Sequence, residues 1–342
     1  MSIRLAVVDD SAFARKALAR IVAQEEDITV VGLAASGEEL LAHLDEWRPN
    51  AVTLDLSMPG MGGLPTLERI LAWNTIPVLI LSGQATREAP LALEALHRGA
   101  ADFIDKQEFS LVDFQSLRGA IVKRLRTLVT THPRGNEPPA ATPRPMVAPP
   151  GPAAFDLVVV GASTGGPPAI EQILAGLGAP PPVPIVIVQH MPAGFTTAFA
   201  ERLNSHLPFP VEEVWHNRRL VPGTVYIAPA GSHLRVHDEG SGLRAALSRF
   251  PETQHRPSVD VLFRSAAAFA PRVIGVLLTG MGDDGAHGLL ELSSRGSFTV
   301  AQDEPSSIVY GMPRAAVELG AVTEQISLFN IGPRLRSLFD LH

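Results

Sequence analysis

The sequence predicts an α/β protein made of two doubly wound parallel-sheet domains joined by a proline-rich linker. In residues 3–130, strand-like and helix-like segments alternate without hairpin turns, which calls for parallel strands with right-handed crossovers. In residues 155–302, continuous β-branched runs are typical of strands covered on both faces. Between them, residues 132–154 are rich in Pro and Ala and lack apolar periodicity, which indicates a semi-extended tether. We therefore expect domains at residues 1–130 and 155–342 and a linker at residues 131–154.

The composition excludes several classes of protein. The chain has 342 residues, of which 46% are hydrophobic and 18% charged, as in globular proteins. A net charge of −7 without any Lys/Arg block gives no general attraction to nucleic acid. The absence of cysteine excludes disulfides, thiolate metal sites and cysteine nucleophiles, and it fits a reducing compartment. No apolar run is long enough to span a bilayer and the N-terminus does not resemble a signal peptide, so we expect a cytoplasmic protein that is not embedded in a membrane.

The first domain is expected to hold five strand–helix units. Short apolar runs predict the strands, and the longer segments between them predict the helices. The expected strands are Ile3–Val8, Ile28–Leu33, Ala51–Leu56, Pro77–Leu81 and Ala101–Ile104, and the expected helices are Ala12–Ala23, Glu38–Trp47, Leu64–Trp73, Ala89–Arg98 and Leu111–Leu128.

Polar side chains gather at the ends of these strands. Asp9 and Asp10 end the first strand, Asp55 lies near the end of the third, Ser82 ends the fourth, and Lys106 follows the fifth. The carboxyl ends of parallel strands lie on one edge of a sheet, so these side chains should converge there. Three carboxylates repel one another, and a hard divalent cation such as Mg²⁺ relieves the repulsion through oxygen ligands. Lys106 and the Ser82 hydroxyl could then hold the oxygens of a phosphoryl group on Asp55.

Residues 1–130 resemble the response-regulator receiver domain, which has a flavodoxin-like fold. The resemblance implies phosphorylation of Asp55 by a sensor histidine kinase. It also implies a Mg²⁺ ion held by Asp9, Asp10 and Asp55. Phe103, three residues before the lysine, matches the aromatic switch position of such domains, and with Ser82 it would report phosphorylation to another surface.

The second domain opens with a buried strand, a turn of small residues and a helix that starts near Pro167 and Pro168. Proline at a first helical position costs no hydrogen bond, because that N–H would be unpaired anyway. The expected strands are Leu157–Val160, Val183–Val188, Val273–Thr279 and Thr299–Gln302, the expected helices are Ile170–Leu177, Phe195–His206, Ser258–Phe269 and Leu289–Arg295, and residues 211–235 mix short strands and turns.

Three chemically active side chains follow apolar strands of this domain. Ser163 follows the first strand, His190 the second, and Asp283 and Asp284 follow the third. A hydroxyl, an imidazole and a carboxylate that meet at one sheet edge form the set that a serine nucleophile needs. Taken singly, each has a structural alternative: the glycine-rich turn could cradle phosphate, the histidine could be structural, and the acids could cap a helix. The remaining histidines are interpreted as surface or structural residues: among them His206, His216, His233, His237 and His287.

The second domain resembles the chemotaxis protein-glutamate methylesterase (CheB) family, and the order of both halves matches. The motifs that carry the resemblance are Gly161-Ala-Ser-Thr-Gly-Gly166, Gln189-His-Met-Pro192, Ala193-Gly-Phe195, His255-Arg-Pro-Ser-Val-Asp260, Leu278-Thr-Gly-Met-Gly-Asp-Asp-Gly-Ala286 and Tyr310-Gly-Met-Pro-Arg314. The resemblance implies that Ser163 is the nucleophile, His190 the base and Asp284 the orienting carboxylate. It further implies an oxyanion donor at the Met281 backbone N–H and an active-site role for Thr164.

The resemblance implies hydrolysis of glutamyl methyl esters on the cytoplasmic helices of chemoreceptors, with release of methanol, and deamidation of receptor glutamines. Phosphorylation of the receiver would relieve inhibition of the esterase. No cofactor is expected for ester hydrolysis. The alternatives are a phosphorylation-switched adaptor that binds receptors without hydrolysis, and the same esterase in a pathway other than chemotaxis.

Overall fold

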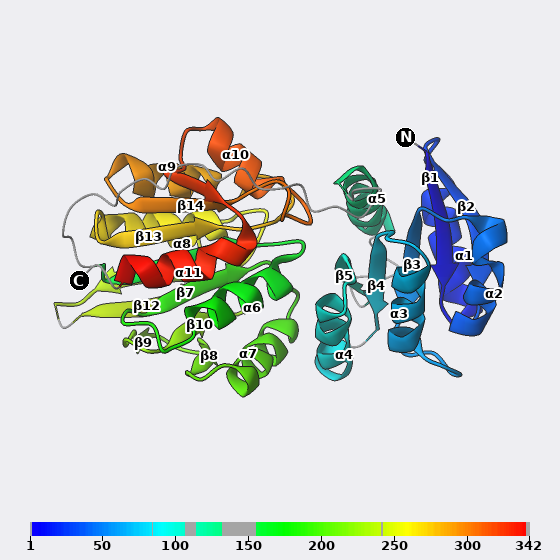
Figure 1. Cartoon of the computed structure of the whole chain (residues 1–342), viewed down its shortest axis with the longest axis horizontal. Helices are drawn as coiled ribbons and strands as arrows, with labels where there is room; N and C mark the ends of the chain where they lie inside the picture. Colours follow the sequence, from blue (N-terminus) through cyan, green and yellow to red (C-terminus); the bar gives the residue numbers. More distant parts are fainter. Residues whose placement is uncertain (1, 84, 107–113, 132–154, 241, 340–342) are drawn as a thin grey trace. The chain divides into compact units, whose positions relative to one another are not determined.

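The computed structural model describes residues 2–83, 85–106, 114–131, 155–240 and 242–339 (Figure 1). The chain divides into two compact units, Met1–Glu137 and Pro138–His342. The predicted linker segment 132–154 lies outside the described residues. Each unit is an α/β fold with its own parallel sheet.

The first unit has a five-stranded sheet in the order β2-β1-β3-β4-β5 in which every pair is parallel. This is the flavodoxin-like order, and it confirms the predicted fold class. Strands β1, β3, β4 and β5 are buried along most of their length, as expected for a sheet with helices on both faces. The elements are β1 (Ile3–Val8), α1 (Ala12–Val22), β2 (Ile28–Ala34), α2 (Gly37–Trp47), β3 (Ala51–Asp55), α3 (Gly63–Trp73), β4 (Val78–Ser82), α4 (Ala85–His97), β5 (Asp102–Asp105) and α5 (Phe114–Thr131).

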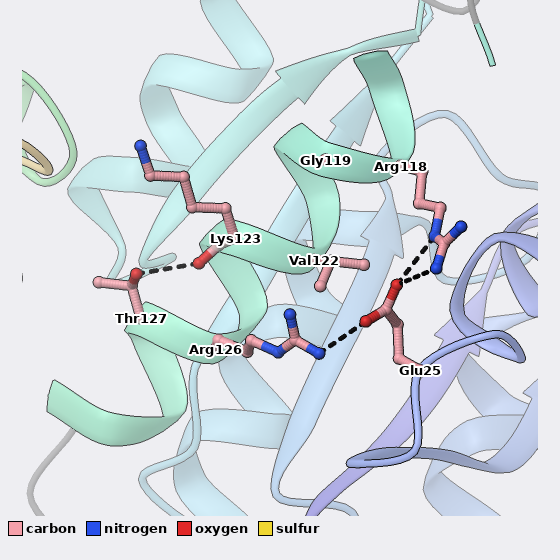
Figure 2. Close-up of a pocket in the computed structure, with 7 residues that line it drawn as sticks. All are labelled: Glu25, Arg118, Gly119, Val122, Lys123, Arg126 and Thr127. Carbon is pink, nitrogen blue, oxygen red and sulfur yellow. Dashed lines mark hydrogen bonds and ion pairs between the residues drawn. The ribbon is translucent and has the colours of Figure 1, made fainter. Parts of the chain in front are cut away.

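Helix α5 forms ion pairs with an acidic side chain of the loop between α1 and β2. Figure 2 shows Glu25 between two arginines of α5, beside a hollow of about 390 Å³. Arg118 Nη2 and Arg126 Nη2 each lie 2.6 Å from a carboxylate oxygen of Glu25. The hydrogen bonds from Arg118 and then Arg126 lower the pKa of Glu25. These pairs lie at the surface with Glu25 only partly buried, so they orient the helix rather than contribute much stability.

The second unit has a seven-stranded parallel sheet in the order β15-β14-β13-β6-β7-β10-β8. The first strand of this sheet along the chain is β6. On one side of it lie β7, then β10, then the edge strand β8, and on the other side lie the later strands β13, β14 and β15. The boundary between β6 and β13 is therefore the point where the winding reverses, and ligands of such folds bind beyond the strand ends there. The elements up to that point are β6 (Leu157–Ala162), α6 (Gly166–Leu177), β7 (Ile185–Gln189), α7 (Phe195–His206), β8 (Val211–Glu213), β10 (Val225–Ile227), α8 (Val259–Ala266), η2 (Ala267–Phe269) and β13 (Val273–Leu277).

Several elements of this unit were not predicted. Strands β9 (Arg218–Arg219), β11 (His233–Asp238) and β12 (Leu243–Ser248) form a separate antiparallel sheet. After α9 (Ala286–Ser294) and β14 (Phe298–Gln302), the chain adds α10 (Met312–Glu318), β15 (Glu324–Ile326) and α11 (Leu328–Phe339). The Gly332-Pro333 pair inside α11 resembles a helix break, and β15 has only three residues, so neither gave a clear sequence pattern.

The glycine in α11 is explained by its packing against α6 (Figure 1). A Cβ on Gly332 would lie 2.5 Å from the carbonyl oxygen of Ile173, so only glycine allows the two helices to approach this closely. Two residues further along α11, Arg334 forms a buried ion pair with Glu324 of β15, with Nη2 and Oε1 2.7 Å apart. No helix in the described part of the chain is long and apolar enough to cross a membrane.

Candidate active site and phosphorylation site

An acidic cluster lies at the carboxyl edge of the first sheet. Asp9 and Asp10 follow β1 and Asp55 ends β3, and one ligand oxygen from each lies within 4.8 Å of the others. Asp9 and Asp55 are buried, whereas Asp10 is exposed. Carboxylate oxygens at this spacing suit a hard divalent cation such as Mg²⁺. The residues present therefore fit the ion that the receiver resemblance implies.

Lys106 joins the two buried acids of this cluster. Its Nζ lies 2.7 Å from Asp9 Oδ2 and 2.8 Å from Asp55 Oδ2. Burial by itself would lower the pKa of Lys106, but the hydrogen bonds and charges of Asp55 and Asp9 outweigh burial and raise the pKa. The lysine therefore stays charged and holds a positive group beside Asp55. Phe103 is a buried residue of β5, the strand that Lys106 follows.

An unexpected carboxylate lies over the end of β4. Glu88 of α4 accepts hydrogen bonds from the Ser82 hydroxyl at 2.9 Å and from the Gly83 backbone N–H at 2.5 Å. Its other oxygen accepts from the Ser57 hydroxyl at 2.8 Å. Ser57 in turn donates its backbone N–H to Asp55 Oδ1. Glu88 thus occupies donors that surround Asp55, including the hydroxyl that we expected to hold a phosphoryl oxygen.

In the second unit, Ser163 lies directly after β6 on a turn that its backbone holds in place. Its N–H donates to the Thr279 carbonyl at 3.0 Å, and its carbonyl accepts from Gln189 Nε2 at 2.9 Å and from the Gly166 N–H at 2.8 Å. These bonds tie the turn to β7, to the start of α6 and to the loop after β13. The Ser163 side chain is left half-buried at the strand end, and among the described residues its hydroxyl has no hydrogen-bond partner.

His190 and Asp284 are joined by a hydrogen bond between their side chains. Nε2 of His190 lies 2.8 Å from Oδ2 of Asp284, whereas the neighbouring Asp283 is exposed. An ionised carboxylate can only accept, so the proton of the neutral ring is on Nε2 and the lone pair is on Nδ1. That Nδ1 is buried and has no hydrogen-bond partner among the described residues. No hydrogen bond joins it to Ser163 within the described residues.

The Asp284 carboxylate is held by the start of α8. Oδ2 also accepts from the Val259 N–H at 2.7 Å, and Oδ1 accepts from the Ser258 hydroxyl at 2.8 Å and the Asp260 N–H at 3.0 Å. Burial by itself would raise the pKa of Asp284, but the hydrogen bond and charge of His190 and these backbone donors hold it well below its usual range. Asp284 is therefore a fixed anion.

One face of the His190 imidazole packs against a second histidine. His255 stacks on His190 with ring centroids 4.1 Å apart and an interplanar angle of 14°. A pocket of about 290 Å³ opens beside this pair. Its lining includes Thr253, His255, Arg264, Asp283, Asp284 and His287.

The loop after β13 approaches the serine turn closely. A Cβ on Gly280 would lie 2.8 Å from Cβ of Ser163, so the residue must be glycine for the two segments to meet. Met281, the expected oxyanion donor, is the next residue in this loop. Thr164 is buried, and its carbonyl accepts from the Thr279 hydroxyl at 2.9 Å.

The sequence did not reveal Glu88, Ser57 or Ser258 as parts of these sites. Ser258 lies in a motif that we used for the family resemblance, and a serine directly before a helix is a recognisable N-cap. Glu88 was missed because it lies just before the expected helix Ala89–Arg98, whereas the helix begins at Ala85.

Comparisons with known proteins match both units of the chain. The CheB methylesterase family model matches residues 158–335, and the response regulator receiver domain model matches residues 5–116. A protein-glutamate methylesterase/protein-glutamine glutaminase of Nocardioides sp. is 40% identical over 97% of this chain and 94% of its own length. A second relative of that name, from Cupriavidus pinatubonensis, is 41% identical over 97% of this chain and 95% of its own length.

Among solved structures, the Thermotoga maritima CheB methylesterase catalytic domain is 35% identical, with a TM-score of 0.52. It covers 54% of this chain and 99% of its own length. Both domain models match in the expected order, and the relatives align along nearly their whole length. The chain therefore belongs to the CheB methylesterase family, with a response-regulator receiver domain at its N-terminal end.

Proposed function

We propose that the protein is a phosphorylation-activated protein-glutamate methylesterase that also deamidates protein glutamine, acting in the cytoplasm on chemoreceptors. The observation that carries this proposal is the His190–Asp284 pair, which leaves a buried Nδ1 without a hydrogen-bond partner among the described residues. His190 follows β7, and β7 pairs with β6, the strand that Ser163 follows. A neutral imidazole with a free nitrogen and an oriented ring is suited to removing a proton from a serine hydroxyl. The near-full-length similarity to enzymes of that name supports the substrate class.

In the proposed reaction, Ser163 Oγ attacks the carbonyl carbon of a glutamyl methyl ester while His190 Nδ1 takes the hydroxyl proton. The Asp284 carboxylate stabilises the imidazolium that forms. When the carbon–oxygen bond to the methoxy group breaks, His190 returns the proton and methanol leaves. Water then attacks the acyl-serine with His190 as base, which frees Ser163 and leaves a glutamate side chain. With a glutamine substrate, the leaving group is ammonia.

The negative charge that develops on the substrate carbonyl oxygen needs donors close to Ser163. The Met281 backbone N–H is the proposed donor, because Gly280 brings this loop against the serine turn. Thr164 follows Ser163 in the same turn, just before the start of α6. Loss of one such donor typically lowers the rate by about 100- to 1,000-fold.

For the receiver, we propose that Asp55 accepts a phosphoryl group from a sensor histidine kinase. Asp9, Asp10 and Asp55 would hold Mg²⁺, which supplies positive charge to the transferred group when bound. Lys106 would hold one phosphoryl oxygen and the Ser82 hydroxyl another. The two ion pairs with Asp9 and Asp55 hold the Lys106 ammonium group beside Asp55.

We also propose that residues 1–130 form the receiver, 131–154 the linker and 155–342 the catalytic domain. Ser82 and Phe103 would change position on phosphorylation of Asp55 and relieve inhibition of the esterase. Such a change is a shift between two arrangements of the protein, driven by the new charge.

The test is methanol release from methylated receptor membranes, comparing the wild type with Ser163→Ala and Asp55→Asn, each with and without acetyl phosphate. We expect release from the wild type to rise with acetyl phosphate, to stay basal in Asp55→Asn and to vanish in Ser163→Ala. Release that ignores acetyl phosphate would remove the regulatory claim and keep the esterase. No release from the wild type, together with phosphorylation-dependent receptor binding, would favour the adaptor.

A further inference from the structure

His233, the first residue of β11, is a fully buried histidine whose two ring nitrogens are both engaged. Its Nδ1 accepts a hydrogen bond from the Ser258 backbone N–H at 3.1 Å. Nδ1 therefore carries the lone pair, so the proton lies on Nε2 and is donated to the Pro251 carbonyl at 2.9 Å. Burial lowers the pKa of His233, which agrees with a neutral ring. The proposed reaction makes no use of this side chain.

The Nδ1 side of His233 leads to the catalytic pair through Ser258. Ser258 is the N-cap of α8, and its hydroxyl donates to Oδ1 of Asp284 at 2.8 Å. The other oxygen of Asp284 accepts from Nε2 of His190. His233 therefore fixes the backbone of the residue that orients the Asp284 carboxylate.

The Nε2 side leads to the same imidazole through the loop after β12. Besides the Pro251 carbonyl, Nε2 lies 3.4 Å from the Thr253 hydroxyl. That hydroxyl donates to the His255 carbonyl at 2.6 Å. The His255 ring stacks on His190. The two nitrogens of His233 thus serve two separate chains of contacts, and both chains end on the ring of His190.

We propose that His233 is a positioning residue of the active site, which orients the His190 imidazole through Ser258 and Asp284 on one side and through Thr253 and His255 on the other. This inference rests on the proposed function, because it assigns His190 the role of base. It explains why a buried histidine from the small antiparallel sheet contacts both segments that flank the catalytic pair. A hydrophobic side chain could fill the same space but could serve neither chain.

The experiment uses full-length protein and three substitutions at this position. His233→Asn keeps an acceptor at the place of Nδ1, and His233→Gln keeps a donor at the place of Nε2. His233→Leu keeps neither. The control is His237→Asn on the same strand, because His237 is partly exposed and pairs with Glu239 away from the site. Three readouts are taken: kcat and KM for methanol release, the rate at which a fluorophosphonate labels Ser163, and the proton resonance of His190 Nε2–H.

We expect His233→Gln to lower kcat and the labelling rate by roughly 10- to 100-fold at little-changed KM, since an unpaired Ser258 N–H shifts the carboxylate. The His190 proton resonance should move in this variant. His233→Asn should restore most of the resonance position and part of the rate, and His233→Leu should fall at least as far as His233→Gln. Wild-type labelling and resonance in folded His233→Gln would overturn the proposal. So would losses that follow the melting temperature alone, whichever nitrogen is kept.

If His233→Gln fails to fold, Thr253→Val tests the second chain, because it removes the hydroxyl that holds the His255 carbonyl. The expected result is a changed ring-current shift on His190 with slower Ser163 labelling, and unchanged values would refute that chain. A wild type that releases no methanol and is not labelled would sink the proposed function instead. The His190 resonance in the variants would still decide the positioning claim.

Discussion

Asp284, which lies just before α9, caps the start of α8, and Asp260 of α8 caps the start of α9. The Asp284 carboxylate accepts from the Val259 and Asp260 N–H groups at the start of α8, at 2.7 and 3.0 Å. In return, Oδ1 of Asp260 accepts from the Gly285 and Gly288 N–H groups at the start of α9, at 3.0 and 2.7 Å. Each carboxylate thus satisfies donors that a helix leaves unpaired. The carboxylate that orients His190 is therefore also a structural part of a helix pair.

Asp284→Asn should lower kcat by roughly 1,000- to 10,000-fold, because the amide can donate to Nε2 and move the ring proton to Nδ1. The base would then lack its lone pair. Methanol release measures the effect. Asp283→Asn is the matched control, since Asp283 is adjacent but exposed, and it should stay near the wild-type rate. Similar losses in both variants would contradict the assignment.

Glu88→Gln should speed the phosphorylation of Asp55 severalfold. The Glu88 carboxylate now accepts from Ser82 and Gly83, and a phosphoryl group on Asp55 must compete for the same donors. A neutral acceptor makes weaker hydrogen bonds and competes less. The measurement is incorporation of label from acetyl phosphate, with Glu94→Gln in the same helix as the control. Slower or unchanged labelling would show that Glu88 does not compete.

Removal of divalent cations should abolish phosphorylation without silencing the serine. Without a cation, the repulsion among Asp9, Asp10 and Asp55 opposes the arrival of a phosphoryl group. In EDTA we expect acetyl phosphate labelling to fall to background while a fluorophosphonate still labels Ser163. Restoring Mg²⁺ should restore the first signal. Loss of serine labelling in EDTA would mean that the catalytic site also needs a metal.

Glu324→Gln should lower the free energy of unfolding of the second unit by about 3–5 kcal/mol, because it leaves Arg334 buried without its charge partner. Chemical denaturation followed by far-UV circular dichroism measures it. The control is Glu318→Gln, whose partner Arg314 lies 3.8 Å away with both side chains exposed. That change should alter stability by less than about 1 kcal/mol. Equal effects would show that the buried pair contributes nothing special.

Stability should fall as the pH drops below about 6.5, in part through His233. Burial, aided by Arg256 and Arg235 and opposed by the Pro251 carbonyl and Asp284, lowers the pKa of this ring below that of the unfolded chain. The unfolded state then binds the proton more readily, so His233 contributes fully above about pH 6.5 and its contribution is lost as the pH falls toward the folded pKa. Unfolding free energies at pH 7.5 and 5.5 should differ less in His233→Asn than in the wild type. An unchanged difference would exclude His233 as a source.

The positions of Asp55, Ser163 and His190 could be predicted because each lies at the carboxyl end of a strand. Within each parallel sheet, these ends lie at one edge. Periodicity and strand order suffice for that inference. The choice between Asp283 and Asp284 could not be made from spacing, because both acids follow the same strand. It depends on which carboxylate reaches the donors at the start of α8, and those donors come from a distant segment.

The role of His233 and Glu88 could not be predicted for a related reason. A histidine in a short polar strand resembles a surface residue until its partners are known, and the antiparallel sheet that buries it was not predicted. Glu88 lay just outside the expected helix Ala89–Arg98. In both cases the side chain acts through contacts with residues of other elements.

The mutual capping of α8 and α9 has a consequence for how the enzyme acquires activity as it folds. The bonds between the two helix starts join residues 24 to 28 positions apart, and the His190–Asp284 bond joins residues 94 positions apart. The serine turn also depends on distant partners, because its backbone bonds to Thr279 and Gln189. Both the nucleophile and the acid therefore reach their places only when these loops have closed. An incompletely folded or truncated chain would carry the nucleophile without its base in register.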